Sequence, residues 1–571
     1  MQIEKDLASV QEAQAKVDEA YAAWLEYRKF TQEQIDTIVE AVASAARAAA
    51  RRLAELAVAE TGMGNVEDKI AKNMLSGDLL PRAIRGMKTV GVLRELPDQR
   101  ITEIGVPQGV IAAICPTTNP TSTVIYKTII ALKSGNAIVL SPHPRARQCT
   151  CETAAVMAAA ATAAGAPEGL IQCVTSSTLE STSALMKHPK TGVILATGGS
   201  GMVRAAYSSG KPAFGVGPGN VPVLVDASAD IPKAVERIVS GKKFDYGTVC
   251  SSEQTLVAER SLRDRILAEL TRQRAFLLND EQRQAVERTL FAHGTTVSAN
   301  CVGQSPQKIA HLAGITVPAD ATILCAEIHG VGKDHPLSAE KLSPVLALLF
   351  TPCFDTALDA CEAILQFGGL GHTSAIHAQD EAQVRRYGLR MPSFRVLVNS
   401  GAPQGSVGIT TALQPSMTLG CGAIAGNITS DNIGPMHLVN IKRIAWAVRS
   451  TEEAMPPAAT PLSVDKSALL AAVERHLAER GITLSPATLA QSASPATAMA
   501  ASCGCSPKPA EAPPTAAPAT PPLKIVAFVC EDDVRAAIQS KKKIFIGPRT
   551  IVTPAARDLA AAGEILVMAE R

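Results

Sequence analysis

Residues 242–259 read KKFDYGTVCSSEQTLVAE and place Cys250 on a turn just ahead of a strand-like run. Gly247 lets the backbone turn tightly before the thiol, and the alternating run QTLVAE predicts a strand. A cysteine on a loop that leads into a strand can reach a cleft, where its thiolate is a strong nucleophile. The alternative is a small buried apolar residue, which is the commoner role of a free cysteine. The choice between the two depends on what surrounds Cys250 in the rest of the chain.

Length and composition narrow the class of protein. A chain of 571 residues is too long for one core, so two or three domains are expected. The sequence is 46% hydrophobic and 19% charged with a net charge of +2, which gives no electrostatic reason to expect nucleic acid or an anionic membrane as a partner. No run of about 18 apolar residues is present to span a bilayer, and the start, MQIEKDLASV, lacks the apolar core of a signal peptide. We therefore expect a cytoplasmic protein whose 13 cysteines are reduced thiols.

Strand-like and helical patterns alternate through the first 425 residues. Residues 1–235 predict a parallel sheet wound with helices on both faces, as in a dinucleotide-binding domain. A pair of strands near 101–110 interrupts it and is expected to reach a partner subunit. Residues 236–425 repeat the alternation, contain Cys250 and are expected to form a catalytic domain, and residues 426–450 predict a closing arm.

The composition changes sharply after residue 451. Residues 451–522 are rich in Ala, Pro, Ser and Thr and predict a flexible linker, because they cannot bury a core. Residues 464–480 within it predict an amphipathic helix. Its apolar face consists of Leu469, Leu470, Val473 and Leu477. Residues 523–571 predict a small segment of the order strand, helix, strand, helix, strand.

A glycine-rich turn, ATGGSGMV, lies between a predicted strand and a predicted helix. Glycines allow a close backbone approach, and the helix N-terminus favours a pyrophosphate. The spacing is not GxGxxG, so an ordinary tight turn is the alternative. Residues of this turn that could meet a cofactor are Thr197, Gly198, Gly199 and Ser200.

Three further polar residues are candidates for a site. Asn119, in CPTTNPTS, could hold an oxyanion with its amide, or it could simply form a turn. Glu340, in EKLSPV, could accept ribose hydroxyls, or it could be a solvated loop charge. His372, in GGLGHTS, could act as an auxiliary base or be a structural histidine. No metal site is expected, since the pair Cys503 and Cys505 has no second ligand pair nearby.

Residues 20–450 closely resemble the CoA-acylating aldehyde dehydrogenases of the aldehyde dehydrogenase superfamily. These include the dehydrogenase half of bifunctional aldehyde/alcohol dehydrogenases and the propionaldehyde and acetaldehyde dehydrogenases of microcompartments. The runs that carry the resemblance are FTQEQID, CPTTNPTSTVIYK, SPHPRA, ATGGSGMVRAAYSSGKPAFGVGPGN, FDYGTVCSSEQ, EKLSPVLAL, GGLGHTS and PSMTLGCG. The resemblance implies an α/β fold with a Rossmann-like cofactor domain, an α/β catalytic domain and a small oligomerisation arm, here followed by a flexible extension. It also implies a homo-oligomer, either a dimer or a tetramer.

The same resemblance implies roles for single residues. Cys250 becomes the nucleophile and Asn119 the oxyanion donor, with His372 as an auxiliary group. The residues expected to bind the cofactor NAD are Thr117, Ser141, Pro142, His143, Thr197, Gly198, Gly199, Ser200, Val203, Gly215, Val216, Gly217, Glu340 and Leu342. In the implied reaction a short aldehyde forms a thioester on Cys250, NAD takes the hydride, and coenzyme A carries the acyl group away.

Two departures from hydrolytic relatives bear on this reaction. Those enzymes carry a water-activating Glu before a G-G-K turn, and Gly215 stands at the matching position. The Lys-Pro-Ser-Glu run that grips the adenosine ribose in many relatives is replaced by SPHPR at 141–145, which leaves NAD or NADP open. Arg145 or Arg147 could meet a phosphate of CoA. A hydrolytic aldehyde dehydrogenase, an acylating enzyme for sulfoacetaldehyde and a non-enzymatic scaffold remain alternatives.

The C-terminal extension resembles another group of sequences. Short amphipathic helices set in flexible linkers resemble the encapsulation peptides that carry enzymes into bacterial microcompartments. We therefore expect residues 464–480 to bind shell proteins and the enzyme to work inside such a compartment in the cytoplasm. The alternatives are a helix that packs on the enzyme's own oligomer and a binding module at 523–571.

Overall fold

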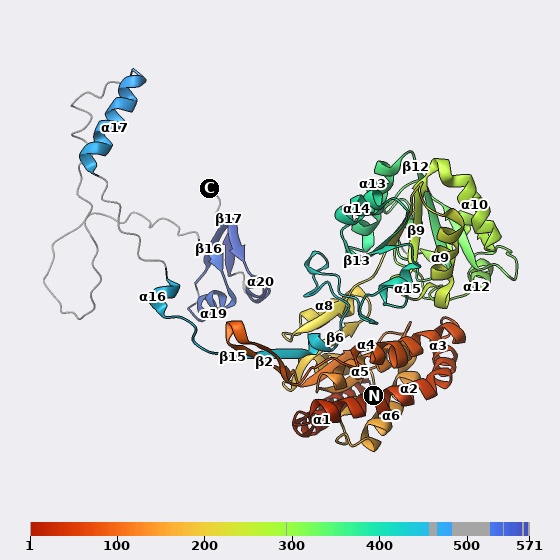
Figure 1. Ribbon diagram of the computed structural model, residues 1–571, viewed down its shortest axis with the longest axis horizontal. Coiled ribbons are helices and arrows are strands. Elements are labelled where there is room, and N and C mark those ends of the chain that lie inside the picture. The colour runs from red at the N-terminus through yellow and green to blue at the C-terminus, as the bar shows by residue number, and fades with distance from the viewer. Residues whose placement is uncertain are drawn as a thin grey trace. The chain divides into compact units, whose positions relative to one another are not determined.

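The computed structural model describes residues 2–292, 294–455, 465–481, 526–540, 542–561 and 565–568. The chain forms two units, Met1–Pro457 and Ala458–Arg571. Figure 1 shows the first unit as two α/β lobes and a long-stranded arm. No described helix is long and apolar enough to cross a membrane.

The first lobe is built on a five-stranded parallel sheet. Its strand order is β5-β4-β3-β6-β7. The strands are β3 (Val110–Ile114), β4 (Ala137–Ser141), β5 (Ile171–Cys173), β6 (Thr191–Thr197) and β7 (Ala213–Val216). Every residue of β3 and β4 is buried, because a parallel sheet is covered on both faces and its strands are continuous apolar runs.

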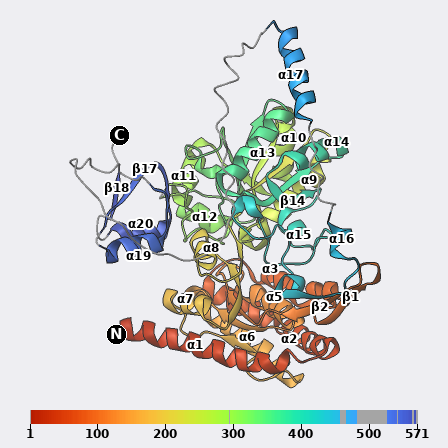
Figure 2. The same cartoon turned by 90° about the vertical axis from the view of Figure 1, so that its left-hand side faces the viewer.

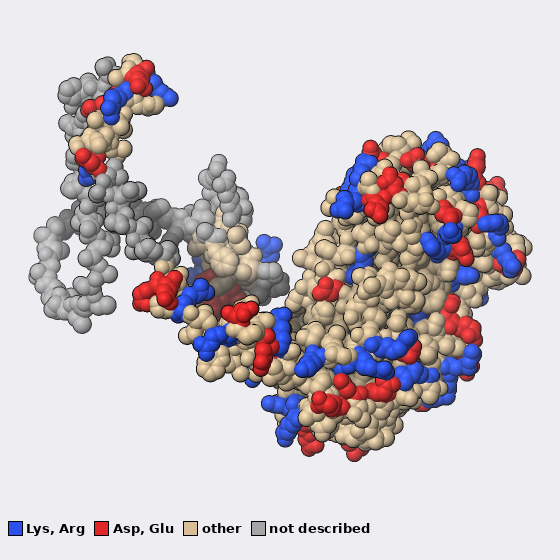
Figure 3. Space-filling model, viewed as in Figure 1, with Lys and Arg blue, Asp and Glu red and all other residues tan. Residues whose placement is uncertain are grey.

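Helices cover both faces of this sheet. The helices α1 and α7 pack together on one face, and α5 and α6 pack on the other with α2 outside them. Figure 2 shows α1, in red, running along the lobe beside α7. The helices of the lobe are α1 (Gln2–Tyr27), α2 (Gln32–Thr61), α3 (Val66–Met74), the π-helix η1 (Leu75–Leu79), α4 (Leu80–Ile84), α5 (Pro120–Lys133), the 3-10 turn η3 (Pro144–Ala146), α6 (Arg147–Ala163), α7 (Leu179–Lys187) and α8 (Ser200–Tyr207). Exposed cations and anions are interspersed over the face shown in Figure 3, and pairs such as Arg52–Glu152 join neighbouring helices.

The second lobe is a seven-stranded parallel sheet with Cys250 just ahead of its central region. Its strand order is β10-β11-β12-β9-β8-β13-β14. The strands are β8 (Val221–Val225), β9 (Glu253–Glu259), β10 (Ala275–Leu277), β11 (Ile323–Glu327), β12 (Val345–Thr351), β13 (Gly371–His377) and β14 (Ser393–Val398). The strand β9 confirms the strand predicted from QTLVAE.

Two apolar cores lie on the two faces of this sheet. The helices of the lobe are α9 (Ile231–Lys243), the 3-10 turns η4 (Phe244–Gly247) and η5 (Arg260–Leu262), α10 (Arg263–Arg272), α11 (Asp280–Leu290), α12 (Pro306–Leu312), η6 (Pro336–Ser338), α13 (Phe354–Gly368), α14 (Glu381–Arg390), α15 (Ala402–Ser406), η7 (Ala423–Ala425) and η8 (Pro435–Leu438). Because β8 pairs with β9 and β13, this lobe begins near residue 221, ahead of the boundary at 235 that the sequence predicts. An apolar run such as VPVLV does not reveal which of two parallel sheets it joins.

A three-stranded antiparallel sheet forms the arm. Its order is β1-β2-β15, so a strand from residue 439 onward pairs with one near residue 101. The elements are β1 (Gly91–Leu96), η2 (Pro97–Gln99), β2 (Ile101–Pro107), β15 (Val439–Ala445) and the short helix α16 (Thr451–Ala454). The predicted strand pair near 101–110 is divided, since β2 belongs to the arm and β3 to the first sheet.

The second unit contains an isolated helix and a small α/β segment. Its elements are α17 (Lys466–Glu479), β16 (Val526–Val529), α19 (Glu531–Gln539), β17 (Ile544–Val552), α20 (Pro554–Ala561) and β18 (Leu566–Met568). The helix α17 lies within the helix predicted at 464–480, and the described strands and helices between residues 526 and 568 follow the order strand, helix, strand, helix, strand. The predicted linker lies largely outside the described residues.

In the first unit, the carboxyl ends of the strands of one sheet face the amino ends of the strands of the other sheet. In the first lobe the carboxyl ends of the strands lead to Thr117 after β3 and end at Thr197 in β6. In the second lobe the amino ends of the strands begin just after Cys250, ahead of β9, and at His372 in β13. Residues far apart in sequence are therefore brought to one junction.

Candidate active site

A cavity of about 390 Å³ lies at this junction and is lined from both lobes. The predicted site residues that line it are Thr117, Asn119, His143, Thr197, Gly198, Gly199, Val216, Gly217, Cys250, Glu340 and Leu342. The structure therefore brings together most of the residues that the sequence singles out.

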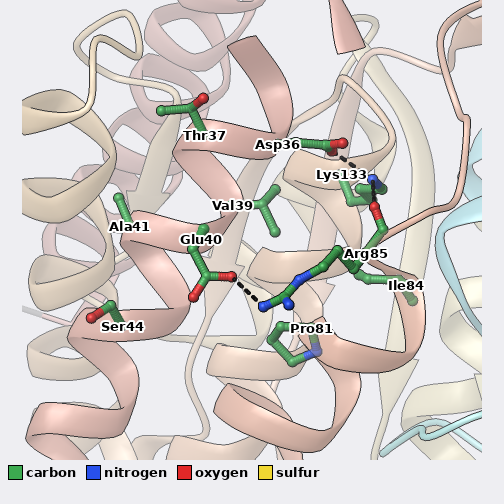
Figure 4. Close-up of a pocket in the computed structure, with 10 residues that line it drawn as sticks. All are labelled: Asp36, Thr37, Val39, Glu40, Ala41, Ser44, Pro81, Ile84, Arg85 and Lys133. Carbon is green, nitrogen blue, oxygen red and sulfur yellow. Dashed lines mark hydrogen bonds and ion pairs between the residues drawn. The ribbon is translucent and has the colours of Figure 1, made fainter. Parts of the chain in front are cut away.

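A second cavity, of about 610 Å³, lies between α2, α4 and the end of α5. Figure 4 shows its two ion pairs, Lys133 with Asp36 and Arg85 with Glu40. None of its described lining residues is a cysteine or histidine. Size alone therefore does not identify the active site. The smaller cavity is the candidate, because Cys250, Asn119 and Glu340 line it.

Cys250 follows the η4 turn and reaches the cavity as a partly exposed side chain. Gly247 has φ +71°, and a Cβ there would lie 2.7 Å from the carbonyl oxygen of Ser343, so only glycine fits this turn without strain. The Cys250 Sγ lies 3.2 Å from His372 Nε2. The sequence does not predict this contact, because 122 residues separate the two.

The surroundings of His372 keep its imidazole neutral. Its side chain is buried, and its Nδ1 lies 3.0 Å from the Thr373 hydroxyl. Burial, with a further contribution from the Arg395 charge, lowers the pKa of His372 to about 3. In the tautomer that donates Nδ1–H to Thr373, Nε2 keeps the lone pair that can accept a proton from Cys250.

The thiol of Cys250 is also neutral at pH 7. Burial raises its pKa to about 12, and the Glu340 carboxylate adds to that increase. Both shifts favour a hydrogen-bonded neutral pair of Cys250 and His372 over a thiolate–imidazolium ion pair.

Asn119 begins α5 without capping it. Its side chain makes no capping hydrogen bond. Pro120 occupies the first position of the helix, where a backbone N–H would have no partner within the helix, so the proline loses no hydrogen bond there. The amide oxygen accepts a hydrogen bond of 2.5 Å from Lys72 Nζ, and the amide nitrogen donates to Thr118 Oγ1 at 3.0 Å. One amide hydrogen remains for a group in the cavity.

Glu340 reaches the cavity from the segment ahead of β12. Its Oε1 accepts a hydrogen bond of 3.1 Å from the backbone N–H of Gly219. Burial raises its pKa to about 7, so the carboxyl group changes charge near neutral pH. Its side chain is thus oriented and not a freely solvated loop charge.

The turn between β6 and α8 fits a phosphate-bearing cofactor. Gly199 is the N-cap of α8 and, with Gly198, lines the cavity. The Thr197 hydroxyl at the same wall is screened from solvent and has no hydrogen-bond partner among the described residues. A buried hydroxyl without a partner beside a helix N-terminus is a fitting place for a polar ligand group.

Some predicted cofactor residues lie beside the cavity and do not line it. The Ser141 hydroxyl shares a hydrogen bond with Thr182, and the carbonyl of Pro142 accepts one from Ser177. The chain places Ser200 at the first position of α8, with Val203 in the same helix. Their predicted contacts with the cofactor stay predictions.

The position of Gly215 differs from the sequence prediction. A Cβ there would lie 2.6 Å from Val203 Cγ1 and 3.0 Å from the Tyr207 ring, so a side chain would point at α8. Val216, the next residue of β7, lines the cavity. Because side chains alternate along a strand, a side chain at Val216 points to the opposite face of β7 from one at Gly215, so Val216 is the better position for a carboxylate meant to reach the cavity.

Comparison with known proteins identifies the family. A model described as "Aldehyde dehydrogenase family" matches residues 3–292. The chain belongs to the aldehyde dehydrogenase family. It is similar to the bifunctional aldehyde-alcohol dehydrogenase AdhE of Escherichia coli strain K12, with 44% identity over 444 residues, which are 77% of this chain and 50% of that protein. The chain thus spans about half the length of the bifunctional relatives.

Solved structures agree with this assignment. An acetylating aldehyde dehydrogenase from Geobacillus thermoglucosidasius is 50% identical, with a TM-score of 0.77, and the match covers 79% of this chain and 99% of that one. A propionaldehyde dehydrogenase from the fucose utilisation microcompartment of Clostridium phytofermentans is 29% identical, with a TM-score of 0.68, covering 75% and 96%. The resemblance stated from the motifs is confirmed.

The site also contains residues that sequence reasoning missed. Lys72 contacts Asn119, and Lys69 donates to the backbone oxygen of Thr118, yet both lysines come from α3, nearly 50 residues upstream. The apolar part of the cavity wall is equally scattered. It consists of Met63, Val249, Val302, Val407, Met417 and Leu419. No local motif marks such residues, because each belongs to a different element.

The neutral pair predicts how Cys250 reacts with an alkylating agent. In the protein without ligands the rate of carbamidomethylation by iodoacetamide should rise about tenfold per pH unit from pH 7 to 10 without a plateau, since a higher pKa leaves less thiolate at neutral pH. Mass spectrometry of the Cys250 peptide measures the rate. The assay uses Cys353→Ser as background, because Cys353 is exposed and its pKa is lowered.

A plateau with a midpoint near or below pH 7 would contradict the neutral pair. It would mean that His372 carries the proton and Cys250 is a stabilised thiolate.

Proposed function

We propose that this aldehyde dehydrogenase is a CoA-acylating enzyme that converts a short aldehyde, CoA and NAD to acyl-CoA and NADH. The observation that supports the proposal most is the contact of 3.2 Å between Cys250 Sγ and His372 Nε2 at the wall of a cavity that also holds Asn119. The acetylating relative from Geobacillus thermoglucosidasius, at 50% identity, supports the acylating branch.

In the proposed first step the Cys250 sulfur bonds to the aldehyde carbonyl carbon. The thiol proton passes to His372 Nε2 as the C–S bond forms, because a separate transfer from a thiol of high pKa to an imidazole of low pKa would be strongly uphill. The carbonyl oxygen becomes an alkoxide and is met by the free N–H of the Asn119 amide and the backbone N–H of Cys250. One good oxyanion donor is worth about 3–4 kcal/mol of transition-state stabilisation.

The C–H electron pair of this adduct leaves as a hydride, and a thioester on Cys250 remains. NAD bound along the β6–α8 turn supplies the hydride acceptor. The residues that would hold it are Thr197 and Gly199 at the phosphates and Glu340 at the nicotinamide ribose, where its Gly219 contact fixes the carboxylate. Preference for NAD over NADP stays open.

In the second half-reaction the thiol of CoA attacks the thioester carbon and releases its proton to solvent, which is the one proton that the overall reaction sets free, and Cys250 leaves as the thiol. The Asn119 amide and the backbone N–H of Cys250 again donate hydrogen bonds to the alkoxide that forms when CoA adds to the thioester. His372 Nε2–H then returns its proton to the Cys250 sulfur. Arg145 lines the cavity and is exposed, so it can meet a phosphate of CoA. Arg147 lines a different cavity and donates to the carbonyl of Thr175, which favours Arg145 for this role.

The cavity wall favours a small apolar substrate. Met63, Val302 and Leu419 are among the residues that line the cavity of about 390 Å³, which suits acetaldehyde or propionaldehyde. Sulfoacetaldehyde is the alternative within the acylating class and would need a cation for its sulfonate, for which Arg145 is the candidate.

The first test of the proposal is the dependence of NADH formation on CoA. With propionaldehyde and NAD, steady-state NADH formation should need CoA, and Cys250→Ala should retain less than a few per cent of the rate. Cofactor binding, followed by fluorescence, should stay unchanged in that variant.

A rate equal with and without CoA would instead support the hydrolytic alternative. A Cys250→Ala variant with full activity would move the nucleophile to another cysteine.

The second test introduces a carboxylate that could activate a water molecule for hydrolysis of the thioester. Val216→Glu should raise CoA-independent propionate formation at least about tenfold, because the new carboxylate faces the cavity, whereas Val216→Gln, which has the same shape without the base, should not. Equal effects of the two substitutions would mean that changed packing, and not missing base catalysis, limits hydrolysis. Gly215→Glu is a matched comparison and should give no gain, because its side chain meets Val203.

Open strand edges support a homo-oligomer, as a dimer or tetramer. The strand β14 is an edge of the second sheet and exposes Phe394, while β15 is an edge of the arm and exposes Ile441 and Ile444. Exposed apolar edge strands offer unpaired N–H and C=O groups to a second chain. Residues 101–107 carry the arm strand β2 that β15 pairs with, so the arm remains the proposed contact with a partner subunit.

The exposed apolar face of α17 supports packaging in a bacterial microcompartment. Leu469, Leu470 and Val473 are each about half exposed, and an exposed apolar helix face is suited to a partner groove. The similarity to a propionaldehyde dehydrogenase from a fucose utilisation microcompartment adds to this proposal. The enzyme would then work in the cytoplasm within a shell whose proteins bind α17.

A further inference from the structure

We propose that Lys72 is a positioning residue that fixes the orientation of the Asn119 amide, and that the buried carboxylate of Asp245 holds Lys72 in place. This inference rests on the proposed function, in which Asn119 donates a hydrogen bond to the substrate oxygen. Neither Lys72 nor Asp245 takes part in bond making.

An asparagine amide can serve an oxyanion only in one of its two orientations. If it is flipped, the carbonyl oxygen faces the substrate and repels the developing charge. Lys72 Nζ lies 2.5 Å from Asn119 Oδ1, and an ammonium group has no lone pair to accept from an amide N–H. Only the oxygen can face Lys72, so Nδ2 is turned away from it, towards Thr118 and the cavity.

Asp245 fixes Lys72 in turn. The Asp245 Oδ2 accepts hydrogen bonds from Lys72, from Lys69 at 3.1 Å and from the Thr248 hydroxyl at 2.6 Å. Its Oδ1 accepts one from the backbone N–H of Asn65 at 2.9 Å. The carboxylate is fully buried, so moving Lys72 away would leave Lys69 as its one remaining cationic partner among the described residues, and this loss of a buried ion pair opposes the movement.

The backbone around Asp245 is shaped for this contact. Asp245 has φ +46°, a left-handed conformation that is rare for residues other than glycine. Across from it, a Cβ on Gly64 would lie 1.9 Å from Asp245 Oδ1, so this position has room only for glycine. A strained turn opposite a glycine persists only where the surrounding contacts determine it.

The same carboxylate connects both proposed oxyanion donors. Through Lys72 it reaches Asn119, which belongs to the first lobe. Through Thr248 it is tied to the turn that carries the backbone N–H of Cys250, which belongs to the second lobe. One buried group therefore sets the two donors relative to each other across the junction of the lobes.

The charges of the group keep Lys72 in its ammonium form, since Asp68 adds a second acidic group beside Asp245. Two lysines face one buried carboxylate, and both lysine side chains are almost completely buried. Burial lowers the pKa of Lys72 to about 8, so it is still mostly protonated at pH 7. The pKa of Asp245 is held below its usual value, because the two lysines outweigh the opposing effect of burial.

A double-mutant cycle tests whether Lys72 acts through Asn119. Lys72→Met should lower kcat about 10- to 100-fold with little change in the KM for propionaldehyde, because ground-state binding does not use the oxyanion donor. In an Asn119→Ala background the same substitution should change kcat by less than about twofold, since there is no amide left to orient.

Lys133→Met is the matched control. Lys133 is also a buried lysine paired with a carboxylate, Asp36 at 2.5 Å, but it lies at the far end of α5 against the other cavity (Figure 4). It should leave kcat close to that of the wild type. Thermal unfolding of each variant separates a loss of folding from a loss of orientation.

Lys72→Gln is a second variant for the same question. Its side-chain amide can still donate to Asn119 Oδ1, so kcat should exceed that of Lys72→Met at least about threefold. A Gln variant no better than Met would contradict positioning by a donor.

Failure of this inference and failure of the proposed function give different results. If Lys72→Met lowers kcat by the same factor with and without Asn119, Lys72 acts independently of Asn119 and the inference is wrong. If the wild type forms no NADH that depends on CoA, the proposed function is wrong, whatever the cycle shows.

Discussion

Burial keeps the Cys250 thiol and the His372 imidazole neutral while it holds their reacting atoms 3.2 Å apart. In the proposed reaction the nucleophile therefore forms only as the substrate carbon accepts the sulfur lone pair and the proton moves to His372. Such a pair protects the thiol from adventitious chemistry, because little thiolate exists beforehand. It also means that the groups which stabilise the product of attack, an alkoxide, need to be in place before the reaction begins.

The fold meets this requirement by joining two parallel sheets through opposite ends. Helix N-termini and turns at the carboxyl ends of the first sheet supply Asn119 and the cofactor turn. The amino ends of the second sheet supply Cys250 and His372. Asp245 and its two lysines lie between the sheets and tie α3 to the Cys250 turn. The proposed oxyanion site thus depends on a polar contact inside the protein and not on a single rigid element.

Much of this could be predicted from the sequence, because the signals are local. The turn at Gly247, the strand after Cys250, the glycine turn at 197–201 and the C-terminal order of elements each lie within one short run. Family membership followed from several such runs in one order.

The remaining features depend on contacts between distant segments. The sheet to which β8 belongs is decided by pairing with β9 and β13, which an all-apolar run cannot show. The choice between Gly215 and Val216 depends on which face of β7 meets α8, and a shift of one residue exchanges the faces. Lys72 gave no signal, because a lysine on a helix is usually a solvated charge and only the distant Asp245 makes its burial favourable.

The central claim is that Cys250 carries the acyl group until a thiol removes it. The most direct measurement is the mass of the Cys250 peptide after the enzyme is mixed with propionaldehyde and NAD in the absence of CoA and quenched in acid. The account predicts that this peptide gains the mass of one propionyl group, and that adding CoA before the quench removes the group and yields propionyl-CoA. An unmodified Cys250 peptide under turnover, or an adduct lost as fast without CoA as with it, would contradict the account.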